Sequence, residues 1–144
     1  MFLGQYQHSL DEKGRLTVPA RFRELLAGGA YVTQGFDRCL MVLTTAYFEQ
    51  VYERINAMNL ADPTARLLRR LILSNAYPVD TDKVGRILLP QNLRQVISLE
   101  NEAIIAGQGD YFEIWTPDLW NEQVLQIQDT EANTQRFAAL DLSR

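Results

Sequence analysis

Hydrophobic and polar residues follow two different periods along this chain. Short apolar stretches bounded by polar or glycine-containing segments predict strands, and apolar residues spaced by three and four predict amphipathic helices. The expected strands span residues 5–9, 15–18, 31–34, 40–43, 77–80, 86–89, 102–106 and 111–115. The expected helices span residues 20–26, 44–58, 63–75 and 90–97, and a further helix begins at about residue 116. This mixture of elements predicts an α+β fold.

Polar segments that contain glycine connect these strands in pairs. The segment Asp11–Gly14 has aspartate at the first position and glycine at the fourth position of a type I turn. We therefore expect it to close a hairpin between the first two strands, and Asp82–Gly85 to close an equivalent hairpin later in the chain. Two further hairpins are expected around residues 35–38 and 107–109.

The predicted elements occur twice in the same order. At a constant offset of 71 residues the same residue types recur, with apolar matches between them. The recurring pairs are Tyr6 and Tyr77, Asp11 and Asp82, Gly14 and Gly85, Arg15 and Arg86, Pro19 and Pro90, and Arg23 and Arg94. Four short strands with open edges do not form a stable sheet alone. We therefore expect the two units to pair their edges and to close into a small pseudo-two-fold β-barrel with flanking helices.

The repeat also predicts how the chain is divided. The first unit is expected over residues 5–47 and the second over residues 76–119. Connecting helices are expected over residues 48–75, and a C-terminal helix and tail over residues 120–144. The residues from about 129 onward are polar and weakly helical, and we expect them to be mobile.

Composition places the chain among soluble globular proteins. Of its 144 residues, 47% are hydrophobic and 22% are charged. No apolar run approaches the roughly 20 residues needed to span a bilayer, and Met1–Gly4 lacks the pattern of a signal peptide. The single cysteine, Cys39, cannot form an internal disulfide. Together these features favour a cytoplasmic protein that does not bind membranes.

Charge is distributed unevenly along the chain. The net charge of −4 argues weakly against a simple nucleic-acid binder. Residues 1–99, however, hold 12 basic and 9 acidic residues, whereas residues 100–144 hold 2 basic and 9 acidic ones. The acidic C-terminal third is either an ordinary solvated end or a surface that faces away from a polyanion.

Two aspartates related by the repeat, Asp11 and Asp82, invite comparison with the paired carboxylates of an aspartic protease. That chemistry needs buried loops, whereas these aspartates lie in surface-type turns. His8 is the only histidine and suits a structural hydrogen bond better than a nucleophile–His–Asp set. Cys39 suits a small core or turn position, and the chain has no zinc-binding spacing and no phosphate-binding glycine loop. We therefore expect neither an enzyme nor a metal or cofactor site.

The duplicated turn is a better candidate for binding nucleic acid. An arginine held on a rigid turn can fork onto guanine O6 and N7, and a lysine beside it can neutralise phosphate. We predict that Arg15 and Arg86 read bases and that Lys13 and Lys83 hold phosphates. The residues expected to fix the two turns are Asp11, Asp82, Gly14 and Gly85. In the alternative interpretation the arginines are only structural partners of the aspartates, and the protein is an oligomeric scaffold.

A second group of arginines lies on the predicted helix over residues 63–75. Arg66, Arg69 and Arg70 form a basic stripe there, opposite the apolar positions. A solvated face, or pairing with acidic residues of a neighbouring subunit, explains this stripe better than DNA binding does.

The segments around both turns resemble the bacterial MraZ family. Met1–Pro19, Asp82–Pro90 and Tyr111–Trp115 occur in the family's order over about residues 1–120. The resemblance implies two units like those of the SpoVT/AbrB superfamily, which build a swapped-hairpin barrel, here within one chain. It also implies a ring-shaped homo-oligomer and a transcriptional regulator acting at the promoter of the division and cell-wall gene cluster, which includes its own gene. The family's Asp-x-x-x-Arg motifs fall on Asp11 to Arg15 and on Asp82 to Arg86.

One departure from the family motif distinguishes the two copies. Lys13 matches the lysine of the first motif, whereas Val84 occupies that place in the second copy and Lys83 lies one residue earlier. The two copies are therefore expected to read DNA unequally. In a ring, the turns of several subunits would add along the DNA, which predicts short direct repeats about one helical turn (roughly 10 bp) apart. The expected function is a nucleoid-associated, sequence-specific regulator that binds double-stranded DNA.

Overall fold

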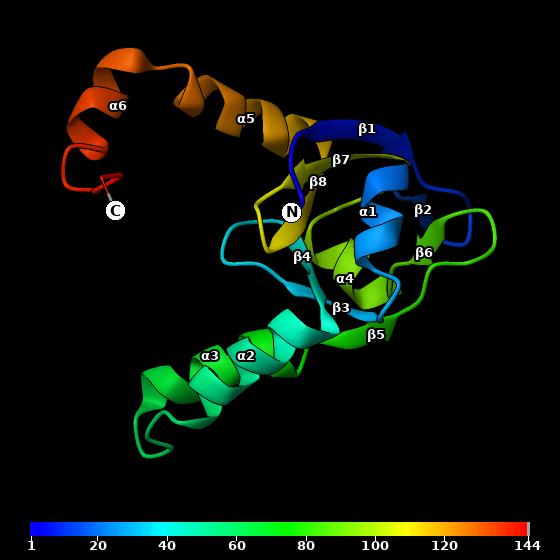
Figure 1. Ribbon diagram of the computed structural model, residues 1–144, viewed down its shortest axis with the longest axis horizontal. Coiled ribbons are helices and arrows are strands. Elements are labelled where there is room, and N and C mark those ends of the chain that lie inside the picture. Colours follow the sequence, from blue (N-terminus) through cyan, green and yellow to red (C-terminus); the bar gives the residue numbers. More distant parts are fainter. Residues whose placement is uncertain (144) are drawn as a thin grey trace.

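The computed structural model describes residues 1–143 and contains a six-stranded antiparallel sheet, a separate two-stranded ribbon and six helices (Figure 1). The strands are β1 (Gln5–Ser9), β2 (Arg15–Thr17), β3 (Ala30–Gln34), β4 (Leu40–Thr44), β5 (Tyr77–Val79), β6 (Arg86–Leu88), β7 (Glu102–Gly107) and β8 (Tyr111–Trp115). The helices are α1 (Ala20–Leu25), α2 (Thr45–Asn56), α3 (Pro63–Leu73), α4 (Gln91–Val96), α5 (Pro117–Ile127) and α6 (Thr130–Arg136). The α+β class predicted from the sequence is confirmed.

The helix ends lie within about two residues of the predicted bounds, and four of the six described helices begin at a side-chain cap. The Thr44 hydroxyl accepts the N–H of Tyr47 at the start of α2, at 3.2 Å. Asp62 caps α3 and is followed by a proline at the first helical position, where the missing N–H costs nothing. The C-terminal region, expected to be only weakly helical, forms α6, whose first turn is capped by the side chain of Asp129.

The first hairpin predicted for each unit is wrong. Strand β1 pairs with β7, with Tyr6 opposite Ile105, and β2 pairs with β6, with Leu16 opposite Ile87. The later hairpins, β3 with β4 and β7 with β8, are confirmed. An alternating pattern specifies which face of a strand is buried but not which strand it pairs with. The two short return strands therefore satisfy their pattern by pairing with each other across the repeat.

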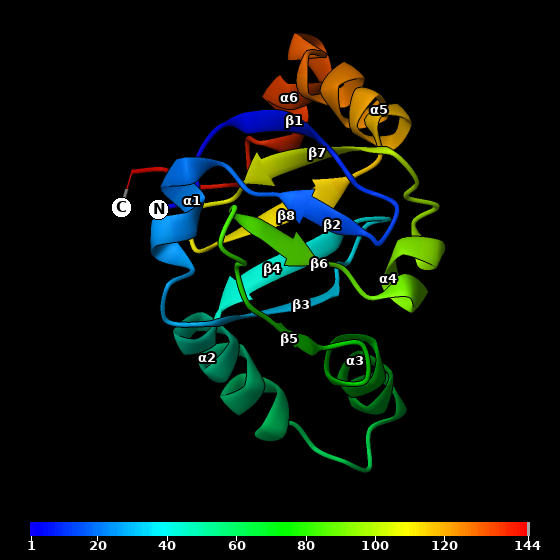
Figure 2. The ribbon, with the colours of Figure 1, turned by 90° about the vertical axis from the view of Figure 1, so that its right-hand side faces the viewer.

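The predicted closed barrel is not confirmed, because the six-stranded sheet is open. Its strand order is β1-β7-β8-β4-β3-β5, so β1 and β5 form its two edges. The chain leaves each edge strand through an aspartate turn and enters the ribbon of β2 and β6, which lies across one face of the sheet (Figure 2). The two units are thus intertwined through the ribbon and through strand pairs that each unit contributes to the sheet.

The main core lies between the ribbon, helices α1 and α4, and one face of the sheet. Phe22 of α1 is fully buried near its centre. Its ring lies 5.0 Å from that of Phe2, 5.2 Å from that of Phe112 and 5.5 Å from that of Tyr6, measured between centroids. These contacts join the N-terminal segment, β1, α1 and β8 in one aromatic cluster.

Helices cover the two ends of the opposite face of the sheet, which we call the back face. Helices α2 and α3 pack on Leu43 at one end, and α5 packs on Trp115 at the other. The two helical arms project from the sheet with open space between them (Figure 1). Within the described residues, no helix has both the length and the apolar character that crossing a membrane requires.

Candidate nucleic-acid interface

The first repeated turn is held together by one aspartate. Asp11 Oδ1 accepts the backbone N–H groups of Lys13 and Arg15, at 3.0 and 2.9 Å. Asp11 Oδ2 accepts the Nε–H of Arg15 at 2.6 Å. The N–H of Gly14 donates to the Asp11 carbonyl at 3.0 Å, and Gly14 adopts a φ of +82°, which a residue with a β-carbon rarely adopts. The turn therefore presents Arg15 in a defined position.

The second turn repeats this arrangement atom for atom. Asp82 Oδ1 accepts the N–H groups of Val84 and Arg86, at 3.0 and 2.9 Å, and Asp82 Oδ2 accepts Arg86 Nε–H at 2.9 Å. Gly85 has a φ of +84°. Val84 thus occupies the place of Lys13, as the sequence comparison of the two turns predicted.

The hydrogen bonds of both turns favour ionised aspartates. The backbone N–H of Arg15, and then its side chain, lower the pKa of Asp11 below its ordinary value despite partial desolvation. Arg86 lowers the pKa of Asp82 in the same order. Because its carboxyl pKa is lower in the folded state, each aspartate stabilises that state at pH values above its unfolded-state pKa. This contribution disappears as the pH falls through the folded-state pKa. Both turns are therefore intact at neutral pH, with each carboxylate committed as a hydrogen-bond acceptor.

The ribbon brings the two turns side by side. The Gly14 carbonyl accepts the N–H of Leu89 at 3.0 Å, and the Gly85 carbonyl accepts the N–H of Val18 at 2.9 Å. Arg86 Nη1 lies 3.5 Å from Asp11 Oδ2, so the second arginine contacts the first turn. Two arginines that are 71 residues apart in the sequence therefore share one surface, on either side of the pseudo-two-fold axis.

Arg23 and Arg94 contribute to this surface in a way that sequence reasoning missed. Arg23 Nε donates to the Val18 carbonyl at 2.8 Å, and its guanidinium lies directly over Gly85 of the other unit. Arg94 Nε donates to the Leu89 carbonyl at 3.0 Å, and its guanidinium lies over Gly14. The matching offset of the two arginines in the sequence was the available signal. Their contact across the two units required the folded chain.

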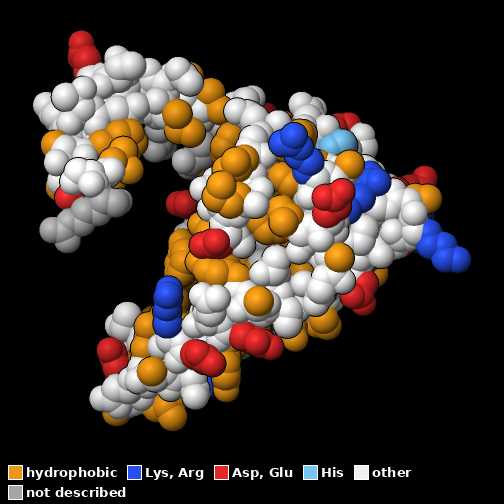
Figure 3. Space-filling view, viewed as in Figure 1, with side chains coloured by type: hydrophobic (Ala, Val, Ile, Leu, Met, Phe, Trp, Pro, Cys, Tyr) orange, Lys and Arg blue, Asp and Glu red, His pale blue; other side chains and the backbone are white. Residues whose placement is uncertain are grey.

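Lys13 and Lys83 are exposed next to the two arginines. Figure 3 shows basic side chains, with acidic ones among them, on the side of the molecule that bears the turns. Each guanidinium is oriented through its Nε by an aspartate, while the side chains of Arg15 and Arg86 remain about one third exposed. The site can thus offer two oriented, solvent-facing guanidinium groups to acceptors on a ligand.

Catalytic or metal chemistry has little support at this site. Both oxygens of Asp11 and of Asp82 accept hydrogen bonds within their own turns. The part of the chain that the structure describes contains no group of three His, Cys, Asp or Glu side chains that could hold a metal ion. Cys39 is fully buried, in agreement with the core position expected for it.

We expect Gly85→Ala to lower the free energy of unfolding more than Gly109→Ala does. Both glycines have a positive φ, near +85°, a conformation that costs a non-glycine residue about 1 to 3 kcal/mol. A β-carbon at residue 109 would meet open space, whereas one at residue 85 would meet the Arg23 guanidinium. Urea denaturation of the two variants measures the difference. Equal losses would show that the packing of Arg23 on Gly85 contributes nothing to stability.

Comparison with known proteins bears on the same two units. The model of the MraZ protein family matches residues 1–71 and again residues 72–142. A protein of Roseiflexus castenholzii called transcriptional regulator MraZ is 42% identical over 142 residues, which is 97% of this chain and 99% of that protein. Proteins of the same name from Thermomicrobium roseum and Herpetosiphon aurantiacus are 42% identical over 141 residues and 45% identical over 120 residues. These alignments cover 97% and 83% of this chain, and 99% and 84% of those proteins.

Proposed function

The chain belongs to the MraZ family, and from this premise we propose that it is a sequence-specific DNA-binding transcriptional regulator. Relatives along nearly its whole length are called transcriptional regulators, which supports a regulator of transcription and not an enzyme. The proposed target is the promoter of the division and cell-wall gene cluster, including the protein's own gene. The proposed location is the cytoplasm, in association with the nucleoid.

The observation that carries this proposal is the pair of equivalent turns on one surface. In each turn an aspartate orients one arginine through its Nε, and the two arginines lie on either side of the pseudo-two-fold axis. A guanidinium held in this way suits bidentate recognition of guanine O6 and N7 in the major groove. Two such groups related by a dyad match the two-stranded symmetry of duplex DNA.

The residues of the turns receive separate roles in this proposal. Arg15 and Arg86 read bases, and Lys13 and Lys83 hold phosphates. Asp11, Asp82, Gly14 and Gly85 fix the turns that present them. The two halves read DNA unequally, because the exposed Val84 takes the place of Lys13 in the second turn.

The proposed assembly is a ring-shaped homo-oligomer that binds short direct repeats. A net-acidic chain with small basic turns gains affinity if several subunits bind one DNA molecule, because linked sites have a high effective concentration. The division into units at residues 5–47 and 76–119, with connecting helices over 48–75 and a C-terminal part over 120–144, remains part of this proposal. The borders at 47 and 119 fall inside α2 and α5, so each longer helix continues from its unit without a break.

The alternative function is an oligomeric scaffold in which the Asp–Arg turns are purely structural. The hydrogen bonds of the turns fit this role too, because they stabilise the ribbon whether or not DNA is present. The scaffold interpretation gives no reason for exposed lysines beside both arginines, and we therefore favour the regulator.

A titration with DNA from upstream of the chain's own reading frame tests the proposed function. We expect duplexes carrying an array of repeats about one helical turn (roughly 10 bp) apart to bind at least ~10-fold more tightly than a single repeat, through effective concentration. Fluorescence anisotropy at several salt concentrations measures both. Equal affinity for one repeat and for the array would rule out the multivalent ring. Equal affinity for the upstream DNA and a shuffled duplex would rule out sequence-specific regulation.

A further inference from the structure

Val84 is an apolar side chain in the second arginine turn, at the place where the first turn has a lysine. It is 60% exposed and takes part in none of the three apolar clusters of the described residues. Turns usually carry glycine, proline, asparagine, aspartate or serine, each for a conformational or hydrogen-bonding reason that valine lacks. The side chain of Asp82 and the positive φ of Gly85 already fix this turn. The Val84 side chain therefore contributes little to the fold.

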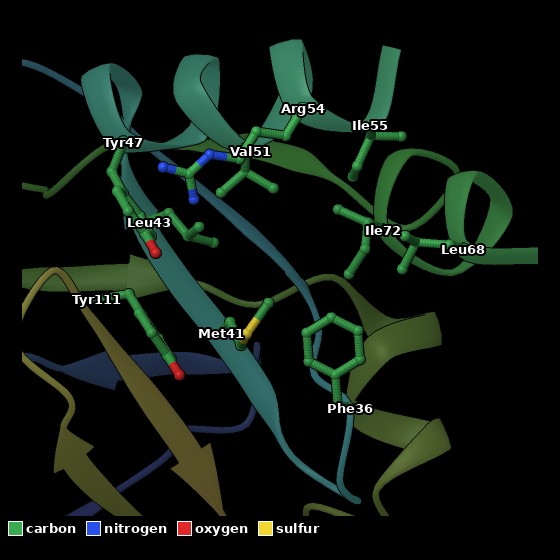
Figure 4. Close-up of a pocket in the computed structure, with 10 residues that line it drawn as sticks. All are labelled: Phe36, Met41, Leu43, Tyr47, Val51, Arg54, Ile55, Leu68, Ile72 and Tyr111. Carbon is green, nitrogen blue, oxygen red and sulfur yellow. The ribbon is translucent and has the colours of Figure 1, made fainter. Parts of the chain in front are cut away.

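A larger apolar surface of the chain lies elsewhere, on the back face of the sheet. An apolar hollow of about 200 Å³ opens there between α2, α3, β4 and β8, and its lining includes Met41, Leu43 and the 73% exposed Phe36 (Figure 4). Met41 and Leu43 point away from the main core beneath the ribbon, which takes the alternate residue Val42. Val84 lies in a turn that leads into the ribbon, so it is not part of this surface.

The position of Val84 beside Arg86 distinguishes it from other exposed apolar residues, which are common singly on protein surfaces. Asp82 Oδ1 accepts the backbone N–H groups of both residues, at 3.0 and 2.9 Å. One carboxylate oxygen therefore fixes the two residues relative to each other. Valine is also stiff about χ1, so its side chain loses little freedom when a ligand covers it. Arg86 thus has an oriented apolar neighbour.

Duplex DNA offers one apolar group in its major groove. Thymine carries a C5-methyl group there, and contact with this group lets an apolar side chain distinguish thymine from the other standard bases. An uncharged valine has no attraction for phosphate, whereas Lys13 in the first turn can neutralise one. The two turns therefore differ in chemistry at equivalent places: the first suits a phosphate and the second suits a methyl group.

We propose that Val84 makes the second turn specific for thymine, by covering the C5-methyl group of a thymine next to the guanine that Arg86 reads. This inference rests on the proposed function and adds one base to the site of the second turn. Lys13 makes no such contact, so one chain reads guanine on both sides of its pseudo-two-fold axis and thymine on one side only. That asymmetry gives each DNA repeat a direction, which suits direct repeats.

Removing single methyl groups from the DNA tests the proposal. The probe is the upstream repeat array, with deoxyuridine in place of thymine at the same position of every repeat, one position per duplex. Uracil pairs as thymine does and lacks only the methyl group. Burying one methyl-sized group is worth about 4-fold in affinity, so we expect at least this loss at one thymine beside a guanine. Fluorescence anisotropy measures the dissociation constants.

Variants of the turn assign that methyl group to Val84. Val84→Ala removes most of the apolar contact, and Val84→Lys gives the second turn the residue type of the first. Either variant should bind the thymine and uracil arrays with nearly equal affinity. Leu125→Ala is the matched control, because it removes a 74% exposed apolar side chain from α5 and should keep the full loss on uracil. Both positions are exposed, so circular dichroism should match that of the unchanged protein.

Two results would overturn the proposal. One is an unchanged protein for which no thymine of the repeat is sensitive to loss of its methyl group. The other is a Val84→Ala variant that keeps the full sensitivity, since another side chain would then cover the methyl group. In both cases the regulator stands if the upstream array binds more tightly than a shuffled duplex. Equal affinity for those two duplexes would instead reject the sequence-specific regulator, and the reading of thymine with it.

Discussion

The double variant Arg15→Ala, Arg86→Ala is expected to bind its operator at least ~30-fold more weakly than the unchanged protein. Each bidentate arginine–guanine contact is worth about 1 to 3 kcal/mol, and this variant loses one in each unit. It also leaves the Asp11 and Asp82 carboxylates without their arginine partners on the surface that we propose faces DNA. Fluorescence anisotropy with the upstream repeats measures the dissociation constants.

Conservative and control variants separate base reading from general charge. Arg15→Lys keeps the charge but loses the planar fork, so we expect it to bind nearly as weakly as Arg15→Ala. Lys13→Ala should weaken binding to specific and to non-specific DNA alike. It should also reduce the slope of log affinity against log salt concentration by about 1. Arg38→Ala removes one exposed charge outside both turns and should have a small effect. An operator affinity in the double variant equal to that of Arg38→Ala would refute base reading by these arginines.

Phe22→Ala is expected to lower the free energy of unfolding by about 3 to 5 kcal/mol, the usual cost of removing a buried phenylalanine. The ring is 1% exposed and contacts the rings of Phe2, Tyr6 and Phe112. Its removal leaves a cavity where the N-terminal segment, α1 and the sheet meet. Such a loss is a large part of the stability of an ordinary small domain. Urea denaturation followed by tryptophan fluorescence measures it.

Leu60→Ala provides the comparison for this variant. Leu60 is 61% exposed in the segment between α2 and α3, and its removal should change stability by less than about 0.5 kcal/mol. A Phe22→Ala variant as stable as Leu60→Ala would mean that the aromatic cluster can repack. It would also mean that the cluster does not fix the position of α1 behind the ribbon.

The two turns were predictable because the hydrogen bonds that the side chains of Asp11 and Asp82 accept come from residues two and four positions ahead. Of the six described helices, four begin at an equally local side-chain cap, such as Thr44 on Tyr47. Residue order alone therefore indicated the α+β class, the repeat, the turns and the arginines that leave them. The identity of the turn-fixing residues followed from short-range hydrogen bonding, which needs no knowledge of the rest of the chain.

Long-range contacts could not be read in the same way. The alternating pattern of β2 was compatible with pairing to β1 or to β6, because both partners bury Leu16 on the same side. In the folded chain β2 pairs with β6, because the chain leaves the sheet at the aspartate turn. The resulting ribbon covers the main core on one face of the sheet. The open sheet in place of the expected barrel follows from that choice.

The candidate interface likewise combines residues that the sequence identifies with contacts that only the folded chain creates. The arginines of the turns were evident from the order of residues, whereas the packing of Arg23 on Gly85 and of Arg94 on Gly14 joins residues that are distant in the chain. The proximity of Arg86 to Asp11 has the same origin. Hydrogen bonds that span two to four residues are encoded in the local order of side chains. Contacts between the two units depend on burying both apolar faces at once, and that free energy exists only when the whole chain is folded.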